Sequence, residues 1–181
     1  LLSENKYRVF GTYRNKKNKS YLPYKFNQNI KKFKEYNLDL LKKPNDLTKL
    51  IKKIKPEIII DFASICMVNE SWKNSKTYFL INVLSKIKMI EYLSQTNFLK
   101  KYIYISTPEI FGSSKNYINE NCCVFSPKTP YATSKLSFEL LLKNYQKNFQ
   151  FPLIISRFSN FYGPGQPLHR LIPKLIGCIE N

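Results

Sequence analysis

Apolar and polar positions along the chain follow two different periods, one typical of buried strands and one typical of amphipathic helices. Runs of β-branched and aromatic residues, such as "PEIIIDFA" and "KKYIYIS", predict buried strands. Apolar residues three or four positions apart predict helices, and Pro56 ends the first of them. The predicted strands cover residues 7–13, 37–40, 57–63, 102–106 and 153–157. The predicted helices cover residues 45–55, 71–96 and 131–148.

This alternation of strands with helices is typical of an α/β protein with a doubly wound, Rossmann-like parallel sheet. A polar stretch at 15–36, a loop at 112–130 and a final segment rich in Gly and Pro complete the chain. A dinucleotide-binding sheet of this class begins with a strand and a glycine-rich turn. The chain has five glycines and none is clustered near its start. We therefore expect a sheet that is truncated at the N-terminus.

Composition narrows the class of protein further. With 181 residues, 43% of them hydrophobic, the chain is expected to form one globular domain. No apolar run approaches the roughly 18 residues of a membrane helix, and no leader precedes the first strand, so we expect a cytoplasmic protein without a membrane partner. Four cysteines without a C-x-x-C spacing and a single histidine argue against a zinc site and fit a reducing compartment.

The chain is strongly basic, with 30 Lys and Arg residues against 12 Asp and Glu residues and a net charge of +18. This balance raises the question of a nucleic-acid partner. The excess is nearly all lysine and is scattered, without an arginine-rich or aromatic-basic motif. We interpret it as a solvated lysine surface and expect no nucleic acid, although the field would favour an anionic small-molecule substrate.

The stretch "ISTPEIFG", residues 105–112, places a hydroxyl, a proline and a carboxylate directly after a predicted buried strand. Chemistry in parallel sheets gathers at the carboxyl ends of the strands, so Thr107 and Glu109 are candidates for a site. Taken alone, Ser106 and Thr107 are more typical of a capped strand end. The wider context decides between these interpretations.

The stretch "PYATSK" places the phenol of Tyr131 and the ammonium of Lys135 four residues apart, on one face of a predicted helix. A nearby ammonium favours the phenolate, so we expect the pKa of Tyr131 to lie below its usual value of about 10. Tyr131 would then be a usable proton acceptor for an alcohol undergoing oxidation. The spacing alone is weak support, because two other Tyr–Lys pairs in the chain share it.

Four blocks of sequence together resemble the extended short-chain dehydrogenase/reductase family. Within it they are most similar to nucleotide-sugar 4,6-dehydratases of the dTDP-glucose or GDP-mannose type, and to epimerases. The blocks are "PEIIIDFASICMVNESW" with "INV", "ISTPEIFG", "PYATSK" and "SRFSNFYGPGQ". Their ordered occurrence is much rarer by chance than any one of them. The resemblance implies that residues 1–165 form an incomplete NAD(P)-binding domain and that residues 166–181 begin the substrate-binding portion, most of which is lacking.

The resemblance also implies the catalytic roles. Tyr131 corresponds to the catalytic base, and Lys135 to its partner, which also holds the nicotinamide ribose. Thr107 corresponds to the hydroxyl that hydrogen-bonds the 4-OH of the sugar. Glu109 corresponds to the dehydratase carboxylate that removes the C5 proton once C4 is oxidised; some decarboxylating relatives have a glutamate there, whereas epimerases usually have no carboxylate.

Further positions are implied for the ligands, and none for a metal. The implied or candidate cofactor-binding residues are Arg14, Asp39, Leu40, Phe62, Ala63, Ser64, Tyr131 and Lys135. The implied or candidate substrate-binding residues are Thr107, Asn160 and Arg170. In the family, Asp39 corresponds to the carboxylate that reads the adenine amine and Asn160 to the residue that holds the diphosphate. The cofactor is NAD or NADP, and the basic residues from Arg14 onward, where an acid would bind a ribose 2′-OH, lean toward NADP.

The implied reaction oxidises C4 with bound NAD(P), eliminates water across C5 and C6, and returns the hydride to C6. The chain departs from the family pattern at one position that affects the elimination of water. Many dehydratases have an aspartic acid where this chain has Pro108. Either Glu109 carries the proton from C5 to O6 itself, or the reaction is not a dehydration. A nucleotide-sugar 4-epimerase or decarboxylase, and a catalytically inactive fragment, are the alternatives. The resemblance further implies a homodimer formed through the helices predicted at 71–96 and 131–148.

Overall fold

In the computed structural model the chain divides into two compact units. Unit 1 contains Leu1–Leu38 and Asn160–Asn181, and unit 2 contains Asp39–Ser159. The structure describes residues 7–14, 33–113, 117–121, 124–160, 162–163, 166 and 170–179.

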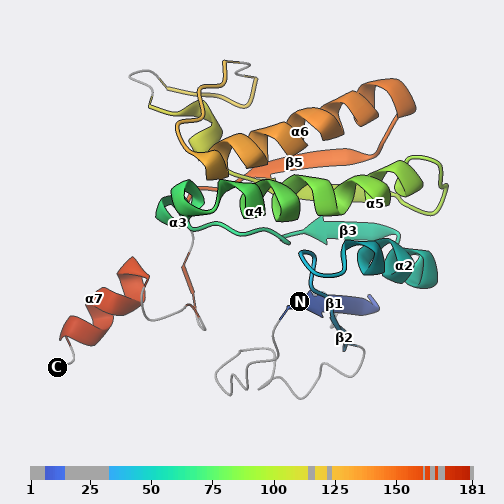
Figure 1. Ribbon diagram of the computed structural model, residues 1–181, viewed down its shortest axis with the longest axis horizontal. Coiled ribbons are helices and arrows are strands. Elements are labelled where there is room, and N and C mark those ends of the chain that lie inside the picture. The colour runs from blue at the N-terminus through green and yellow to red at the C-terminus, as the bar shows by residue number, and fades with distance from the viewer. Residues whose placement is uncertain are drawn as a thin grey trace. The chain divides into compact units, whose positions relative to one another are not determined.

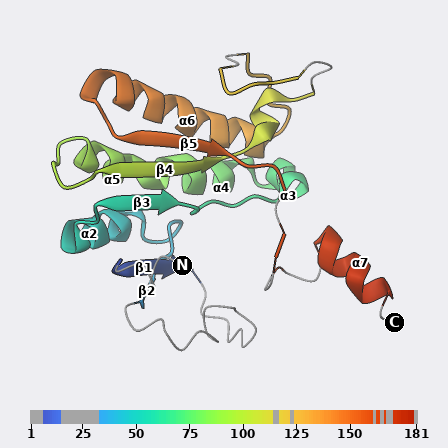
Figure 2. The same cartoon turned by 180° about the vertical axis from the view of Figure 1, so that it is seen from behind.

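Unit 2 is built on a parallel sheet with the strand order β3–β4–β5. The strands are β3 (Ile58–Asp61), β4 (Lys101–Ser106) and β5 (Leu153–Arg157). The helical elements are α2 (Pro44–Ile54), α3 (Val68–Lys73), α4 (Ser75–Phe79), the π-helical η1 (Leu80–Leu84), α5 (Ser85–Leu93), the 3₁₀-helical η2 (Pro108–Phe111) and α6 (Pro130–Phe149). Helices α4, α5 and α6 lie on one face of the sheet, in front of it in Figure 1 and behind it in Figure 2. The parallel α/β fold class predicted from the sequence is confirmed.

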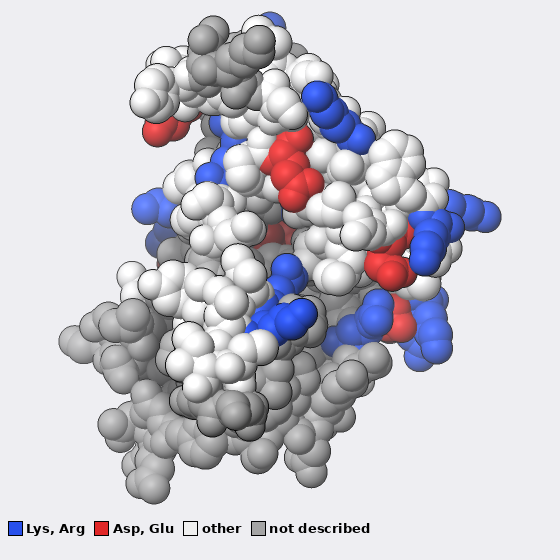
Figure 3. All heavy atoms as spheres, turned by 90° about the vertical axis from the view of Figure 1, so that its left-hand side faces the viewer, with Lys and Arg blue, Asp and Glu red and all other residues white. Residues whose placement is uncertain are grey.

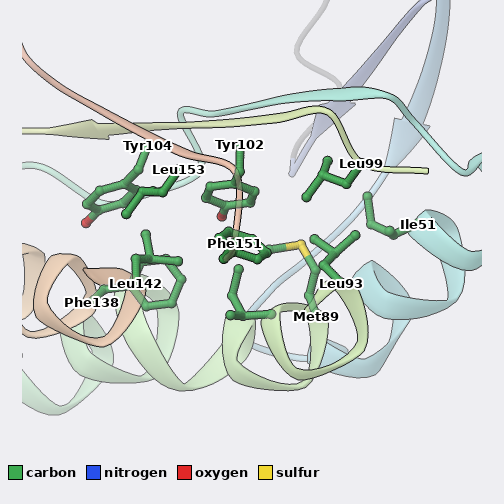
Figure 4. Close-up of a cluster of buried hydrophobic side chains, with 11 residues drawn as sticks. Ile51, Met89, Leu93, Leu99, Tyr102, Tyr104, Phe138, Leu142, Phe151 and Leu153 are labelled. Carbon is green, nitrogen blue, oxygen red and sulfur yellow. The ribbon is translucent and has the colours of Figure 1, made fainter. Parts of the chain in front are cut away.

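The core of unit 2 lies between this sheet and the helices (Figure 4). Alternate side chains of β4 point to the helices, and Tyr102 and Tyr104 are fully buried there. The remaining core members are Ile51, Met89, Ile90, Leu93, Leu99, Phe138, Leu142, Phe151 and Leu153. Because alternation continues along the strand, Ser106 also faces the helical layer and is buried.

The single helix predicted at 71–96 is wrong in its continuity. The structure begins the helical segment earlier, interrupts it at Asn74, whose backbone φ is −138°, and passes through the π-helical turn η1. Asparagine competes with helical hydrogen bonds, which explains the interruption. The extra residue of a π turn rotates the following face. Trp72 shares the helical spacing of the core residues, but it lies in α3, before both irregularities, and is 66% exposed.

The strand predicted at 37–40 is also wrong. The strand is β2 (Phe33–Asn37), which includes residues that we assigned to the preceding polar stretch. The chain then turns, and Asp39 Oδ1 accepts hydrogen bonds from the backbone N–H groups of Leu41 (3.0 Å) and Lys42 (3.2 Å). Leu38 and Leu40 are buried on either side of this carboxylate. Two buried leucines separated by one residue therefore imitate the period of a strand.

Unit 1 pairs β1 (Val9–Tyr13) with β2 in parallel, from Val9 opposite Phe33 to Tyr13 opposite Asn37. Gly11 packs so closely on the ring of Phe33 that a Cβ there would lie 2.7 Å from its Cζ. The final segment contains a helix that the sequence did not predict, α7 (Leu171–Ile179). Its proline is in the first turn, where a missing N–H costs no helical hydrogen bond.

Charge on the described surface is mixed. Figure 3 shows Lys and Arg side chains interspersed with Asp, Glu and uncharged residues. Such interspersion is typical of a solvated surface. Among the described residues, no helix combines the length and apolarity that crossing a membrane requires.

Candidate active site

The segment after β4 presents Thr107 and Glu109 at the carboxyl end of the sheet. Pro108 cannot donate to the ladder, so the strand ends before it. Thr107 has an extended backbone and caps η2, with its Oγ1 accepting from the Glu109 N–H at 3.3 Å. Gly112 ends η2 with φ +68°, and a Cβ there would collide with the carbonyl oxygen of Ser126. These local features hold Thr107 buried and leave Glu109 exposed.

Helix α6 brings Tyr131 to the same place. Thr129 caps the helix by accepting from the Ala132 N–H at 3.1 Å, and Pro130 occupies the first helical position. Tyr131 is 8% exposed, and its ring meets the ring of Tyr78 edge-on at 6.3 Å. Its phenol hydrogen-bonds the side chain of Thr107. The structure therefore brings together two of the residues that the sequence placed on separate elements.

The predicted lowering of the Tyr131 pKa is wrong for this structure. Burial chiefly, together with the nearby Cys66, Glu109 and Tyr78, raises the pKa of Tyr131 to about 12, although the hydrogen bond from Thr107 acts in the opposite direction. Lys135 is not among the groups that chiefly set this pKa. Two residues four positions apart on a helix lie on the same face, but their side chains can still point in different directions.

The ammonium of Lys135 points at β4. Its Nζ donates to the backbone carbonyl of Ile105 at 2.5 Å and lies 4.4 Å from the centre of the Tyr104 ring. Lys135 is only 2% exposed. Burial and the charge of Lys86 lower the pKa of Lys135 to about 8, although Asp61, Cys66 and Glu139 act in the opposite direction.

The Lys135→Met variant should raise the melting temperature of the full-length protein at pH 7, without added nucleotide. The buried ammonium has a pKa of about 8, against 10.5 for the free side chain, which corresponds to a cost on the order of 3 kcal/mol. Between these values the unfolded chain binds more protons than the native one, so wild-type stability rises with pH there. The advantage of the variant should therefore shrink between pH 8 and 10.5. The control is Lys147→Met, at an exposed position of the same helix. If the melting temperatures of wild type and Lys135→Met changed in parallel with pH across this range, the prediction would be contradicted.

Glu109 is close enough to the phenol for its charge to act on Tyr131. Partial burial raises the pKa of the Glu109 carboxyl itself. A carboxyl with a raised pKa can both accept and return a proton nearer to neutral pH. Thr107, Glu109 and Tyr131 thus surround one region at the carboxyl ends of the strands, with Lys135 on the next turn of α6.

A buried ion pair lies at the end of β3, and it was not predicted from the sequence. Lys86 Nζ lies 2.9 Å and 2.7 Å from the two carboxylate oxygens of Asp61, and Tyr102 donates to Oδ2 at 2.8 Å. Asp61 also accepts from the Ala63 N–H at 3.0 Å. The one signal in the sequence was a carboxylate at the end of an apolar run. Because the chain has many lysines, the sequence does not single out Lys86 as the partner of Asp61.

The segment after β3 is held by two further residues. Asn82, turned inward by the π-helical η1, accepts from the Ile65 N–H at 3.0 Å and donates to the Ile65 carbonyl at 3.2 Å. It also donates to Ser134 Oγ at 3.0 Å, and Ser134 donates to the carbonyl of Tyr131 at 2.7 Å. Asn82 therefore joins this segment to the helix that carries the phenol.

The other predicted ligand residues are placed as follows. Phe62 is 61% exposed at the end of β3, and Ala63 and Ser64 are half-buried beside it, which suits a segment that lies against a dinucleotide. Asp39 uses Oδ1 in its own turn, and Leu40 is buried.

Arg14, Asn160 and Arg170 are exposed residues of unit 1. Their roles stay predictions. Among the described residues, no cluster of His, Cys, Asp and Glu could hold a metal ion.

Comparison with known proteins found a matching family model and several similar proteins. A family model described as GDP-mannose 4,6 dehydratase matches residues 1–181. A dTDP-D-glucose 4,6-dehydratase of Dictyostelium discoideum is 34% identical over 146 residues, covering 75% of this chain and 33% of the relative. The chain thus spans about a third of that relative's length.

Two solved structures resemble the fold over most of the chain. A UDP-glucuronic acid 4-epimerase from Bacillus cereus, in complex with UDP-glucuronic acid and NAD, has a TM-score of 0.72 at 30% identity and covers 87% of this chain and 48% of that one. A dTDP-glucose 4,6-dehydratase from Bacillus anthracis in complex with NAD has a TM-score of 0.69 at 26% identity, covering 84% and 46%. The chain spans about half of each.

Proposed function

Because the chain belongs to the GDP-mannose 4,6-dehydratase family, within the extended short-chain dehydrogenases/reductases, we propose that the full-length protein is a nucleotide-sugar 4,6-dehydratase. The observation that carries the proposal is the carboxylate of Glu109, whose charge acts on the phenol of Tyr131. A 4-epimerase needs no carboxylate beside its base, whereas an elimination needs one to remove the C5 proton.

The cofactor is NAD or NADP, and the relatives solved with NAD favour NAD. Bound NAD would accept a hydride from C4 of the sugar and return it to C6. Phe62, Ala63 and Ser64 would lie along the cofactor, Asp39 would meet the adenine, and Tyr131 and Lys135 would face the nicotinamide ribose. Arg14 belongs to unit 1, and its assignment to a 2′-phosphate stays a prediction.

In the first step Thr107 holds the 4-hydroxyl of the sugar and Tyr131 accepts its proton. A phenol with a pKa of about 12 is ionised in only about one molecule in 10⁵ at pH 7. The working state therefore needs a positive charge nearer to the phenol. Lys135 can supply it by leaving the Ile105 carbonyl, since its side chain starts one helical turn away.

In the second step Glu109 removes the proton from C5, which is acidic once C4 is a ketone. The C6–O bond then breaks, and the departing hydroxyl takes up a proton to leave as water. Pro108 has no proton to give, so we propose that Glu109 returns the C5 proton to O6. The raised pKa of the Glu109 carboxyl supports this double role.

The nearest alternative is a 4-epimerase or decarboxylase, supported by the fold shared with the UDP-glucuronic acid 4-epimerase and by Pro108. Incubating the full-length protein with dTDP-glucose, GDP-mannose, UDP-glucose and UDP-glucuronic acid separates them. A dehydratase yields a 4-keto-6-deoxy sugar, which absorbs in alkali. An epimer that keeps every oxygen, or release of carbon dioxide, would overturn the proposal. If only a longer form binds NADH, the present chain is an inactive fragment of that enzyme.

The homodimer and the cytoplasmic location stay predictions. Leu84, on the turn between α4 and α5, and Leu140, on α6, are exposed apolar side chains on the helices that the resemblance assigns to an interface. Asn160 and Arg170 would hold phosphate groups that every nucleotide sugar carries, so they do not specify the nucleotide or the sugar.

A further inference from the structure

A fully buried carboxylate lies on α6, two turns beyond Tyr131 and one beyond Lys135. Glu139 is 0% exposed. Its Oε2 accepts from Ser106 Oγ at 2.7 Å, and its Oε1 accepts from Arg157 Nη2 at 2.6 Å. The proposed reaction assigns no role to this residue.

The partners of Glu139 come from different elements. Ser106 is the last residue of β4, directly before Thr107, and Arg157 is the last residue of β5. Arg157 also donates through Nε to Oε2 at 3.3 Å, so the guanidinium engages both carboxylate oxygens. One carboxylate therefore ties α6 to the carboxyl ends of two strands.

This carboxylate stays ionised despite its burial. Burial alone would raise the pKa of Glu139, but hydrogen bonds from Arg157 and Ser106 and the charges of Arg157 and Lys143 together lower it. Charge-assisted, two-pronged pairs of this kind are short and directional. The connection is consequently rigid as well as strong.

The same guanidinium reaches the segment that carries Glu109. Its Cζ lies 5.3 Å from the ring centre of Phe111 and 5.9 Å from that of Phe125, and the two rings stack at 5.7 Å. Phe111 ends η2, two residues after Glu109, and the Ser126 N–H donates to the Ile110 carbonyl at 2.9 Å. Arg157 thus packs against both segments that approach the site, one before α6 and one after β4.

We propose that Glu139 and Arg157 are positioning residues that set the mutual placement of Thr107, Glu109 and Tyr131. The inference rests on the proposed function for the chemistry that these residues serve, but not for the contacts. A displacement of about 1 Å at reacting groups can cost about a hundredfold in rate. Loss of this pair should therefore slow catalysis far more than it weakens substrate binding.

Two variants of the full-length protein test the proposal, Glu139→Gln and Arg157→Lys. The first keeps the shape of the side chain, and the second keeps its charge but loses the planar fork that spans the carboxylate and the two rings. Each should lower kcat by about 30-fold or more while KM changes less than about threefold. Amide hydrogen exchange should speed up in peptides covering 107–112 and 124–133, and stay unchanged in the β3 peptide.

Lys143→Gln is the matched control. Lys143 contacts the same carboxylate oxygen at 3.3 Å from the same helix and lies 5.2 Å from the ring centre of Phe125, so it does not join α6 to the strands. We expect its kcat within about threefold of wild type. A loss of kcat in the control as large as that in Arg157→Lys would show that a contact made from α6 alone matters as much as the link to the strands, and would overturn the proposal.

The outcomes separate this inference from the proposed reaction. Unchanged exchange and unchanged kcat in both variants would overturn the positioning role, as would faster exchange throughout unit 2, which indicates general destabilisation. If Glu139→Gln does not fold, Arg157→Lys decides alone. If the wild type forms no 4-keto-6-deoxy product but the two peptides still exchange faster in the variants, the positioning role of Glu139 and Arg157 stands and the dehydratase assignment fails.

Discussion

Replacing Tyr131 by phenylalanine should abolish oxidation at C4 in the full-length protein. The phenol is the group that hydrogen-bonds Thr107 and that we assign to accept the 4-hydroxyl proton. A positioned acid–base group contributes roughly 10² to 10⁴ in rate, and kcat/KM should fall by at least about 10³. The measurement is the absorbance of reduced nicotinamide after mixing with substrate, which should not appear.

Folding should survive this change, because the ring of Tyr131 stays in contact with Tyr78 and Thr107 still accepts from the Glu109 N–H. Tyr145→Phe, on the same helix but packed against Phe149 and Phe151, is the control and should keep wild-type kcat/KM. Formation of product by Tyr131→Phe at an appreciable fraction of the wild-type rate would remove Tyr131 from the chemistry.

Replacing Glu109 by glutamine should leave oxidation intact and stop the elimination. The amide keeps the size of the side chain but cannot take the C5 proton, so kcat for product should fall by about 10² to 10⁴. Reduced nicotinamide should then accumulate with the 4-keto sugar still bearing its 6-hydroxyl. Wild-type enzyme in deuterated water should exchange the C5 hydrogen, whereas the variant should not.

The pH dependence gives a second test of the same residue. Burial raises the pKa of Glu109, and the base form is the active one, so the acid limb of the wild-type kcat profile should lie above the usual carboxyl range. That limb should disappear from the residual activity of Glu109→Gln. The exposed Glu120 supplies the control, Glu120→Gln, which should match wild type. Full product formation by the Glu109 variant would contradict the assigned role.

Much of the fold near the site could be predicted from neighbouring residues. The strand at 153–157 has the predicted bounds, because an apolar, β-branched run follows a helix of clear period. Helix α6 begins where Thr129 and Pro130 put it, within one residue of the prediction. The same local chemistry turns β4 into η2 at Thr107 and Pro108.

Three features of the site could not be predicted in this way. The inward turn of Asn82 depends on a π-helical turn, which leaves the apolar spacing of the helix nearly unchanged. The orientation of Lys135 depends on a backbone carbonyl of β4, thirty residues away in the sequence. The rise in the pKa of Tyr131 comes chiefly from burial, which no spacing reveals.

The sequence by itself determined the parallel α/β class and the types of residue that end its strands and begin its helices, because both depend on a few adjacent residues. Only the tertiary structure decided which charges neutralise one another. Asp61 meets Lys86 across 25 residues, and Glu139 meets Arg157 across 18. Such pairs form because a buried charge must find a partner among whatever side chains packing brings near it, and that neighbourhood is a property of the assembled layers.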